Sequence, residues 1–170
     1  MFGVAALEDD LLTLAVDALT TCDRPVPLDV DVYRYHGEPT HWKCCDTGTL
    51  YTYWKRAFPD RTGIPTGVNS PPGPQRLDVY LRIIRCWPEM HSDGSMPAGI
   101  DAASEGLALD LDCLWSALYS AVCTNALGEN LAGCDALQLV DATPRRPLGG
   151  CAGIEFRLQA AWKSWQPDAP

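Results

Sequence analysis

The sequence lacks several features that would assign it to a familiar class. No apolar run approaches the roughly 18 residues that a membrane-spanning helix needs. No basic segment precedes the apolar start, which Glu8, Asp9 and Asp10 interrupt at once. Basic residues are scarce, since 13 Lys and Arg stand against 22 Asp and Glu and give a net charge of −9. We therefore expect a soluble protein made in the cytoplasm, without a tight nucleic-acid site, because affinity for phosphate backbones comes from Lys and Arg.

Recognisable catalytic groups are also few. The chain has only three histidines, and none stands beside a recognisable partner motif: His36, His41 and His91. Residues 149–153 read G-x-C-x-G, the thiol form of the nucleophile elbow, which requires a helix after the nucleophile. Residues 154–162 instead alternate apolar and polar side chains, which predicts a strand. We therefore interpret Cys151 as a small buried residue at a turn and expect no enzyme, with a cysteine hydrolase using Cys151 as a remote alternative.

The eight cysteines do not form the regular C-x-x-C pairs of zinc ribbons. One cluster is close enough in sequence to consider as a metal site, and it consists of His36, His41, Cys44 and Cys45. Adjacent residues of an extended segment face opposite sides, so Cys44 and Cys45 are poorly placed for one tetrahedral centre. We expect no metal, no cofactor, and structural cysteines in a reducing cytoplasm. Cys113 and Cys123 lie in a helical pattern and are interpreted as core residues.

Hydrophobic periodicity predicts two helices and five strands. Leucines recur at helical spacing over residues 7–22 and 107–127, although Gly99 and Gly106 leave the first turns of the second helix uncertain. Alternating or β-branched runs predict strands over residues 28–35, 50–58, 76–87, 135–143 and 154–162. This order predicts an α+β two-layer sandwich, with a mostly antiparallel or mixed sheet of about five strands and both helices on one face. We expect one domain over residues 1–165 and a tail over 166–170.

Residues 59–74 separate the second and third predicted strands and are rich in proline and glycine. Five prolines in sixteen residues prevent continuous strand pairing. A short turn would be enough to join two neighbouring strands. We therefore expect an extended loop or arm that contacts another subunit, and its candidate contact residues are Ile64, Pro65, Val68, Pro71 and Pro72.

Aromatic residues concentrate in the first two predicted strands. If the helices cover one face of the sheet, the opposite face is left for a partner. The candidate assembly surface consists of Tyr33, Tyr35, Tyr51, Tyr53 and Trp54. The alternative is that these aromatic side chains fill the core of the chain itself.

Three segments occur in a characteristic order around the predicted helices: WKCCDTGTLYTYW at 42–54, RLDVYLRIIRCWP at 76–88 and PLGGCAGIEFRLQ at 147–159. In this order they resemble the tail terminator or head-to-tail connector proteins of long-tailed (siphovirus) actinobacterial phages. In those proteins a C-C-x-G-x-L segment, a strand ending in Arg-Cys, and a late G-G-C-x-G followed by an aromatic strand recur. Here the first motif departs by one extra residue before Gly48. The resemblance covers about residues 7–162.

The resemblance implies a structural virion protein, made in the host cytoplasm, that forms a ring, expected to be a hexamer, at the head-proximal end of the tail. Such a ring ends tail-tube polymerisation and joins the tail to the neck. Its implied partners are further copies of itself, the major tail tube protein and the head-tail stopper, with DNA passing through the lumen without specific binding. No membrane, metal or cofactor is implied. A head-tail stopper or adaptor of the same connector is the alternative.

Overall fold

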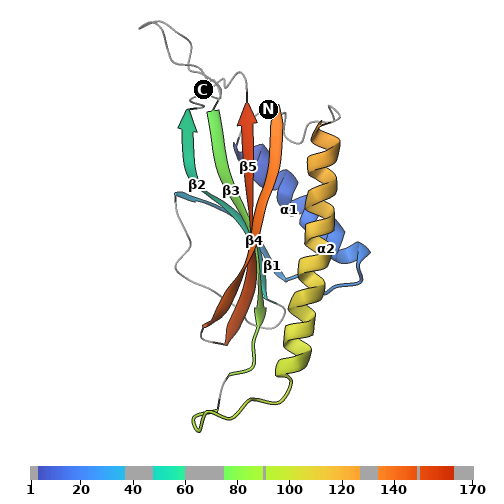
Figure 1. The fold of residues 1–170 in the computed structure, drawn as a ribbon, viewed down its shortest axis with the longest axis vertical. Coiled ribbons are helices and arrows are strands. Elements are labelled where there is room, and N and C mark those ends of the chain that lie inside the picture. Colours follow the sequence, from blue (N-terminus) through green and yellow to red (C-terminus); the bar gives the residue numbers. More distant parts are fainter. Residues whose placement is uncertain are drawn as a thin grey trace, which may run out of the picture.

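The computed structural model describes residues 4–36, 48–59, 75–89, 91–126, 134–148 and 150–162. Its elements follow in the order α1 (Val4–Thr21), β1 (Asp29–His36), β2 (Thr49–Pro59), β3 (Gln75–Cys86), α2 (Ile100–Ala126), β4 (Ala136–Leu148) and β5 (Cys151–Trp162). The five strands form one sheet in the order β1-β2-β3-β5-β4 (Figure 1). β1 and β2 are parallel, and the other neighbouring strands are antiparallel. The expected α+β class is therefore confirmed.

Both helices pack on the same face of the sheet because each strand places alternate side chains on that face. β3 contributes Leu77, Val79, Leu81 and Ile83 to the core, where Phe156 of β5 joins them. Leucines of α1 and α2 fill the other half of the same cluster, and the fully buried ones include Leu7, Leu11, Leu19 and Leu114. α1 lies over β1 to β3, and α2 lies over β4 and β5.

The centre of the sheet is the β3–β5 pair, whose register is continuous from Gln75↔Trp162 to Cys86↔Cys151. Gly153 lies where these strands approach closely, since a Cβ atom at this position would meet the carbonyl oxygen of Ile83. Gly48 precedes β2 with φ +92° and would similarly meet the carbonyl oxygen of Ile84. These two glycines are therefore required by backbone contact within the sheet.

β4 differs from the sequence expectation, which ended this strand at Thr143 and placed a turn after it. The strand continues through Pro144 and Pro147 to Leu148. Proline is tolerated because β4 is at the edge of the sheet, where one side of the strand donates no ladder hydrogen bonds. The register shifts between Leu139 and Asp141, which leaves Val140 as a bulge residue.

Several sequence-based candidates fall outside what the structure describes. The candidate contact residues of the arm are among them, because Ile64, Pro65, Val68, Pro71 and Pro72 all lie in the undescribed residues 60–74. The tail over 166–170 lies outside as well, as do His41, Cys44 and Cys45 of the candidate metal cluster. The expectations for these residues stay predictions.

Candidate functional site

The tyrosines of β2 that were expected to form an assembly surface do not do so. Tyr51 and Tyr53 are 1% and 0% exposed, so the chain itself buries them, which is the alternative that the sequence left open. Trp54 is on the opposite face of β2, half-buried against the helix-covered core. Tyr33 and Tyr35 belong to β1, but their side chains are outside the described part of the chain. The expectation fails because the hydroxyl groups of Tyr51 and Tyr53 hydrogen-bond to buried charged groups, whose burial would otherwise be costly.

Those charged groups form a buried ion-pair network on the sheet face opposite the helices. The guanidinium of Arg82 pairs with the carboxylate of Glu155, and both side chains are almost fully buried. Arg82 also donates to the hydroxyl oxygens of Tyr51 at 3.0 Å and Tyr53 at 2.8 Å. Tyr53 and Arg145 donate to Glu155, so both of its carboxylate oxygens accept hydrogen bonds. The network joins β2, β3, β5 and β4.

Glu155 stays ionised within this network. Burial by itself raises the pKa of Glu155, but hydrogen bonds from Tyr53 and Arg82 and the charge of Arg82 outweigh it, so the pKa lies below its ordinary value. A carboxylate with a lowered pKa and almost no solvent access is a poor general acid or base at neutral pH. We therefore interpret the network as structural.

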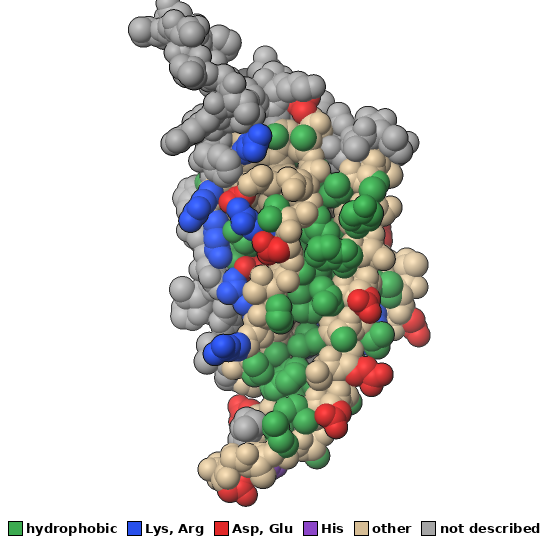
Figure 2. All heavy atoms as spheres, in the orientation of Figure 1, with side chains coloured by type: hydrophobic (Ala, Val, Ile, Leu, Met, Phe, Trp, Pro, Cys, Tyr) green, Lys and Arg blue, Asp and Glu red, His purple; other side chains and the backbone are tan. Residues whose placement is uncertain are grey.

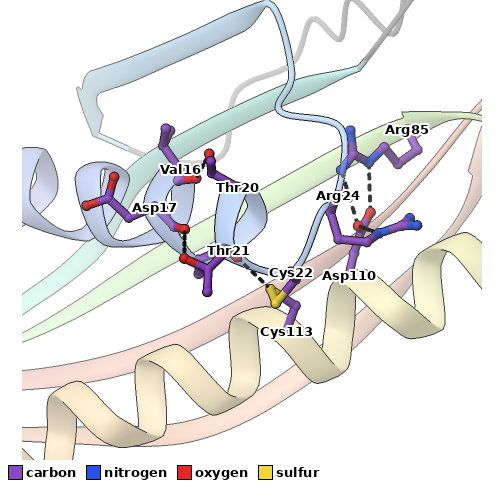
Figure 3. Close-up of a disulfide and its surroundings, with 10 residues drawn as sticks. Val16, Asp17, Thr20, Thr21, Cys22, Arg24, Arg85, Asp110 and Cys113 are labelled. Atoms are coloured by element: carbon purple, nitrogen blue, oxygen red, sulfur yellow. Dashed lines mark hydrogen bonds and ion pairs between the residues drawn. A yellow bond between two sulfur atoms is a disulfide. The ribbon is translucent and has the colours of Figure 1, made fainter.

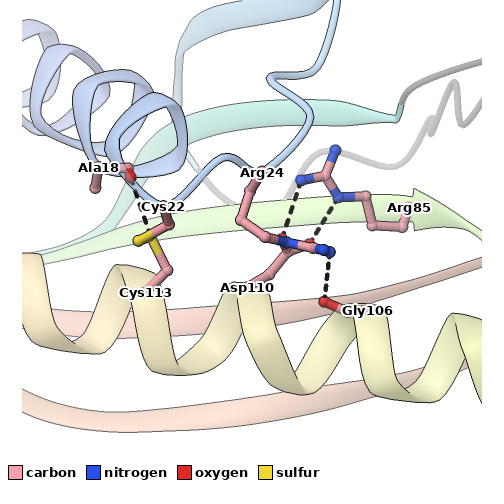
Figure 4. A network of polar contacts seen from close by, with 7 residues as sticks. All are labelled: Ala18, Cys22, Arg24, Arg85, Gly106, Asp110 and Cys113. Carbon is pink, nitrogen blue, oxygen red and sulfur yellow. Dashed lines mark hydrogen bonds and ion pairs between the residues drawn. A yellow bond between two sulfur atoms is a disulfide. The ribbon is translucent and has the colours of Figure 1, made fainter.

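A second buried carboxylate, Asp110 of α2, ties three elements together at the end of α1. It accepts hydrogen bonds from Arg24 at 2.8 Å and from Arg85 of β3 at 2.7 Å (Figure 4). Arg24 also donates to the carbonyl oxygen of Gly106 at 2.8 Å. Two cations on one fully buried carboxylate fix the N-terminal half of α2 over the sheet.

A disulfide between Cys22 and Cys113 lies beside this carboxylate and joins the end of α1 to the middle of α2 (Figure 3). The two Cα atoms are 6.3 Å apart, within the range that a disulfide spans. Cys113 is buried, as expected of a core residue, but it is oxidised, whereas the sequence suggested a thiol in a reducing compartment. Cys123 is free and exposed, so its expected core position is wrong.

Cys151 is the first residue of β5, as the alternating pattern after it suggested, and it is buried. It is disulfide-bonded. A disulfide sulfur is not a thiolate and cannot act as a nucleophile. Among the described residues, no group of three or more His, Cys, Asp or Glu side chains is arranged to hold a metal ion.

The feature left without a role inside the chain is an apolar surface where α2 meets β4, which we call the α2–β4 seam. Its exposed members are Trp115 at 39%, Tyr119 at 59% and Val140 at 37%. Half-buried apolar side chains lie beside them and continue the seam into the core: Leu111, Val122, Leu139 and Ala142. Figure 2 shows this apolar band along the length of the molecule, with Lys and Arg gathered on one side, where some Asp and Glu also lie, and mainly Asp and Glu on the other.

The seam also explains the hydropathy of α2. By length and composition, residues 100–124 are apolar enough to cross a membrane, which the lengths of the uninterrupted apolar runs did not predict. However, Leu114 and Leu118 of this helix are buried in the core, and Asp110 is held by two arginines. We interpret the high hydropathy of α2 as the result of two apolar sides, because one side faces the core and a second lies at the seam.

Sequence reasoning missed the seam for an identifiable reason. Trp115 and Tyr119 are one turn apart and continue the spacing of the core leucines, so they resemble part of one broad apolar face. Only the position of β4, an edge strand, shows that this part of the face has no other described element packed over it. No protein-family model matches the chain, and no curated protein matches its sequence.

Proposed function

We propose that the chain is a structural virion protein that assembles as a homo-oligomeric ring at the head-proximal end of a long phage tail. In this role it ends tail-tube polymerisation and joins the tail to the neck. The observation that carries the proposal is the α2–β4 seam, because exposed Trp115, Tyr119 and Val140 form an apolar surface flanked by charge. Aromatic residues surrounded by a polar rim are typical of protein–protein interfaces.

The resemblance of the three sequence motifs to tail terminator and connector proteins supplies the rest of the proposal. A ring requires on each copy a surface whose contact with the next copy lowers the free energy. Two aromatic side chains and a β-branched one at the centre of such a contact bury a large apolar area, and aromatic residues in particular dominate interface energetics. Cys151 in a disulfide removes the observation that favoured a cysteine hydrolase.

The test is to compare the assembly of the wild-type protein with that of a seam variant, Trp115→Glu/Tyr119→Glu. The matched control is Leu109→Glu, because Leu109 is 47% exposed on the same helix but is not a member of the apolar seam and lines a hollow beside the disulfide. Native mass spectrometry would measure the oligomer, and electron microscopy would measure tail length and head attachment in complemented phage.

We expect the wild type and Leu109→Glu to form rings and tails of uniform length joined to heads. We expect Trp115→Glu/Tyr119→Glu to remain folded and monomeric and to give irregular tails detached from heads. A wild-type protein that is monomeric in solution and absent from virions would contradict the proposal. Imaging of the neck would also separate a terminator, next to the tail tube, from a stopper, next to the head.

A further inference from the structure

Charge is divided between the two helices and the four strands β2 to β5. α1 and α2 together contain eight acidic residues and no basic residue. Strands β2 to β5 contain eight basic and three acidic residues. Although the net charge is −9, basic residues therefore gather on one side of the seam, with some acidic residues among them, and the other side is mainly acidic (Figure 2).

The basic side of the seam, which we call the basic rim, consists of Arg145 and Arg146 of β4 and Arg157 of β5. Arg146 is exposed, and the side chains of Arg145 and Arg157 are 39% and 32% exposed. The carboxylates that the latter two contact, Glu155 and Asp78, are buried inside the chain and are not available to a partner. Arg145 and Arg157 are thus paired within the chain, and the outward positive charge of the basic rim is that of Arg146.

The acidic side, which we call the acidic rim, lies on α2. Asp101, Glu105 and Asp112 are all exposed, and their spacing of four and seven residues places them along one side of the helix, in line with Tyr119. Because α2 contains no Lys or Arg, no partner at i+3 or i+4 neutralises them. The acidic rim is thus a row of like charges on the α2 side of the seam, whereas the basic rim is on the β4 side.

We infer that the occupant of the seam is a second copy of this chain, held so that the basic rim of one copy contacts the acidic rim of its neighbour. This inference rests on the proposed function for its place in a ring, and it adds the charge pairing that orients the copies. Apolar contact at the seam supplies affinity, and the two rims supply orientation, because like rims in contact would repel.

A polyanion such as duplex DNA is the rival occupant of the basic rim. The second copy is favoured because the acidic rim is on the other side of the same narrow seam and would repel a phosphate backbone. The apolar side chains between the rims also offer nothing to a phosphate, whereas they can pack against apolar side chains of another copy. Binding of duplex DNA is therefore an outcome that the test must measure.

The test uses two full-length charge-reversal variants, Arg146→Glu in the basic rim and Glu105→Lys/Asp112→Lys in the acidic rim. Sedimentation velocity at low salt would measure association of each variant alone and of a 1:1 mixture. The control is Asp17→Lys, an exposed acidic residue of α1 that is not part of the acidic rim. Thermal unfolding would verify that every variant is folded.

We expect each rim variant alone to associate about tenfold more weakly than the wild type, since one or two exposed charges are reversed and attraction between the rims becomes repulsion. The mixture should regain association near the wild-type level. In the mixture, the new glutamate of Arg146→Glu can contact the new lysines of Glu105→Lys/Asp112→Lys. Neither variant can form this attractive contact by itself. The Asp17→Lys control should associate like the wild type.

Two results would overturn the inference while leaving the ring itself intact. One is that both rim variants associate like the wild type although Trp115→Glu/Tyr119→Glu does not. The other is that the mixture associates no better than either variant alone. If Arg146→Glu abolished binding to a short duplex DNA without weakening association, the basic rim would be a polyanion site. A wild type that never associates would refute this inference and the proposed ring together.

Discussion

At the residue scale, the sheet face opposite the helices depends on Glu155. Its carboxylate accepts hydrogen bonds from Arg82, Tyr53 and Arg145, which come from three other strands. Replacing such a buried pair by apolar residues is often tolerated, whereas removing one partner leaves a buried charge unpaired. The network therefore makes the fold sensitive to single substitutions at these positions. In the sequence they look like the ordinary polar residues of an alternating strand pattern.

Glu155→Gln should destabilise the folded chain by about 3 to 5 kcal/mol, because it leaves the buried Arg82 guanidinium without its counter-charge. Asp141→Asn is the matched control, since Asp141 is an exposed carboxylate of β4 and should change stability by no more than about 0.5 kcal/mol. Urea unfolding followed by circular dichroism measures both. Equal destabilisation by the two variants would show that the Arg82–Glu155 pair does not stabilise the fold.

The same carboxylate predicts an acid-dependent loss of stability. The pKa of Glu155 is below its ordinary value of 4.5 in the folded chain, so the unfolded chain binds this proton first as the pH falls. The contribution is present in full above about pH 4.5 and is lost as the pH falls through the folded pKa. The difference in unfolding free energy between wild type and Glu155→Gln should therefore shrink from pH 7 to pH 3. A difference that stays constant would contradict this interpretation.

At the element scale, all seven helices and strands could be predicted from periodicity, because core leucines and alternating strand residues repeat at fixed intervals. The end of β4 could not, since Pro144 and Pro147 suggest a turn unless the strand is known to lie at an edge. The parallel pairing of β1 with β2 was also beyond the sequence. Among the site residues, Tyr51 and Tyr53 were misassigned because no local pattern shows that Arg82 and Glu155 lie beside them.

The pairing of Cys22 with Cys113 was also beyond the sequence, because a sequence separation of 91 gives no spacing signal. A disulfide that closes a loop of this length stabilises by about 4 to 5 kcal/mol through the entropy of the unfolded chain. Cys22→Ser/Cys113→Ser should therefore lower the melting temperature by about 10 °C or more. The control is Cys123→Ser, which removes an exposed free thiol of α2. Calorimetry under non-reducing conditions measures both, and equal melting temperatures for the two variants would argue against a stabilising disulfide.

At the scale of the whole molecule, the net charge does not show how unevenly acidic and basic residues are distributed over the surface. A value of −9 argues against a nucleic-acid site when it is taken as an average, yet Lys and Arg gather on one side of the seam and mainly Asp and Glu lie on the other (Figure 2). Such a division favours contact between opposite sides of two copies. The seam and its rims can thus act as one surface, although they come from different layers of the fold.

If opposite rims meet at this contact, salt should weaken association of the wild type. The Debye length falls from about 10 Å at 0.1 M to about 3 Å at 1 M ionic strength, which screens exposed pairs far more than apolar contact. We expect sedimentation velocity to show about tenfold weaker association in 1 M than in 0.1 M sodium chloride. The association of Arg146→Glu should weaken less over the same change in salt, because its rim contact is repulsive at low salt and screening relieves that repulsion. Equal salt dependence in the wild type and Arg146→Glu would show that the seam associates without help from its charged rims.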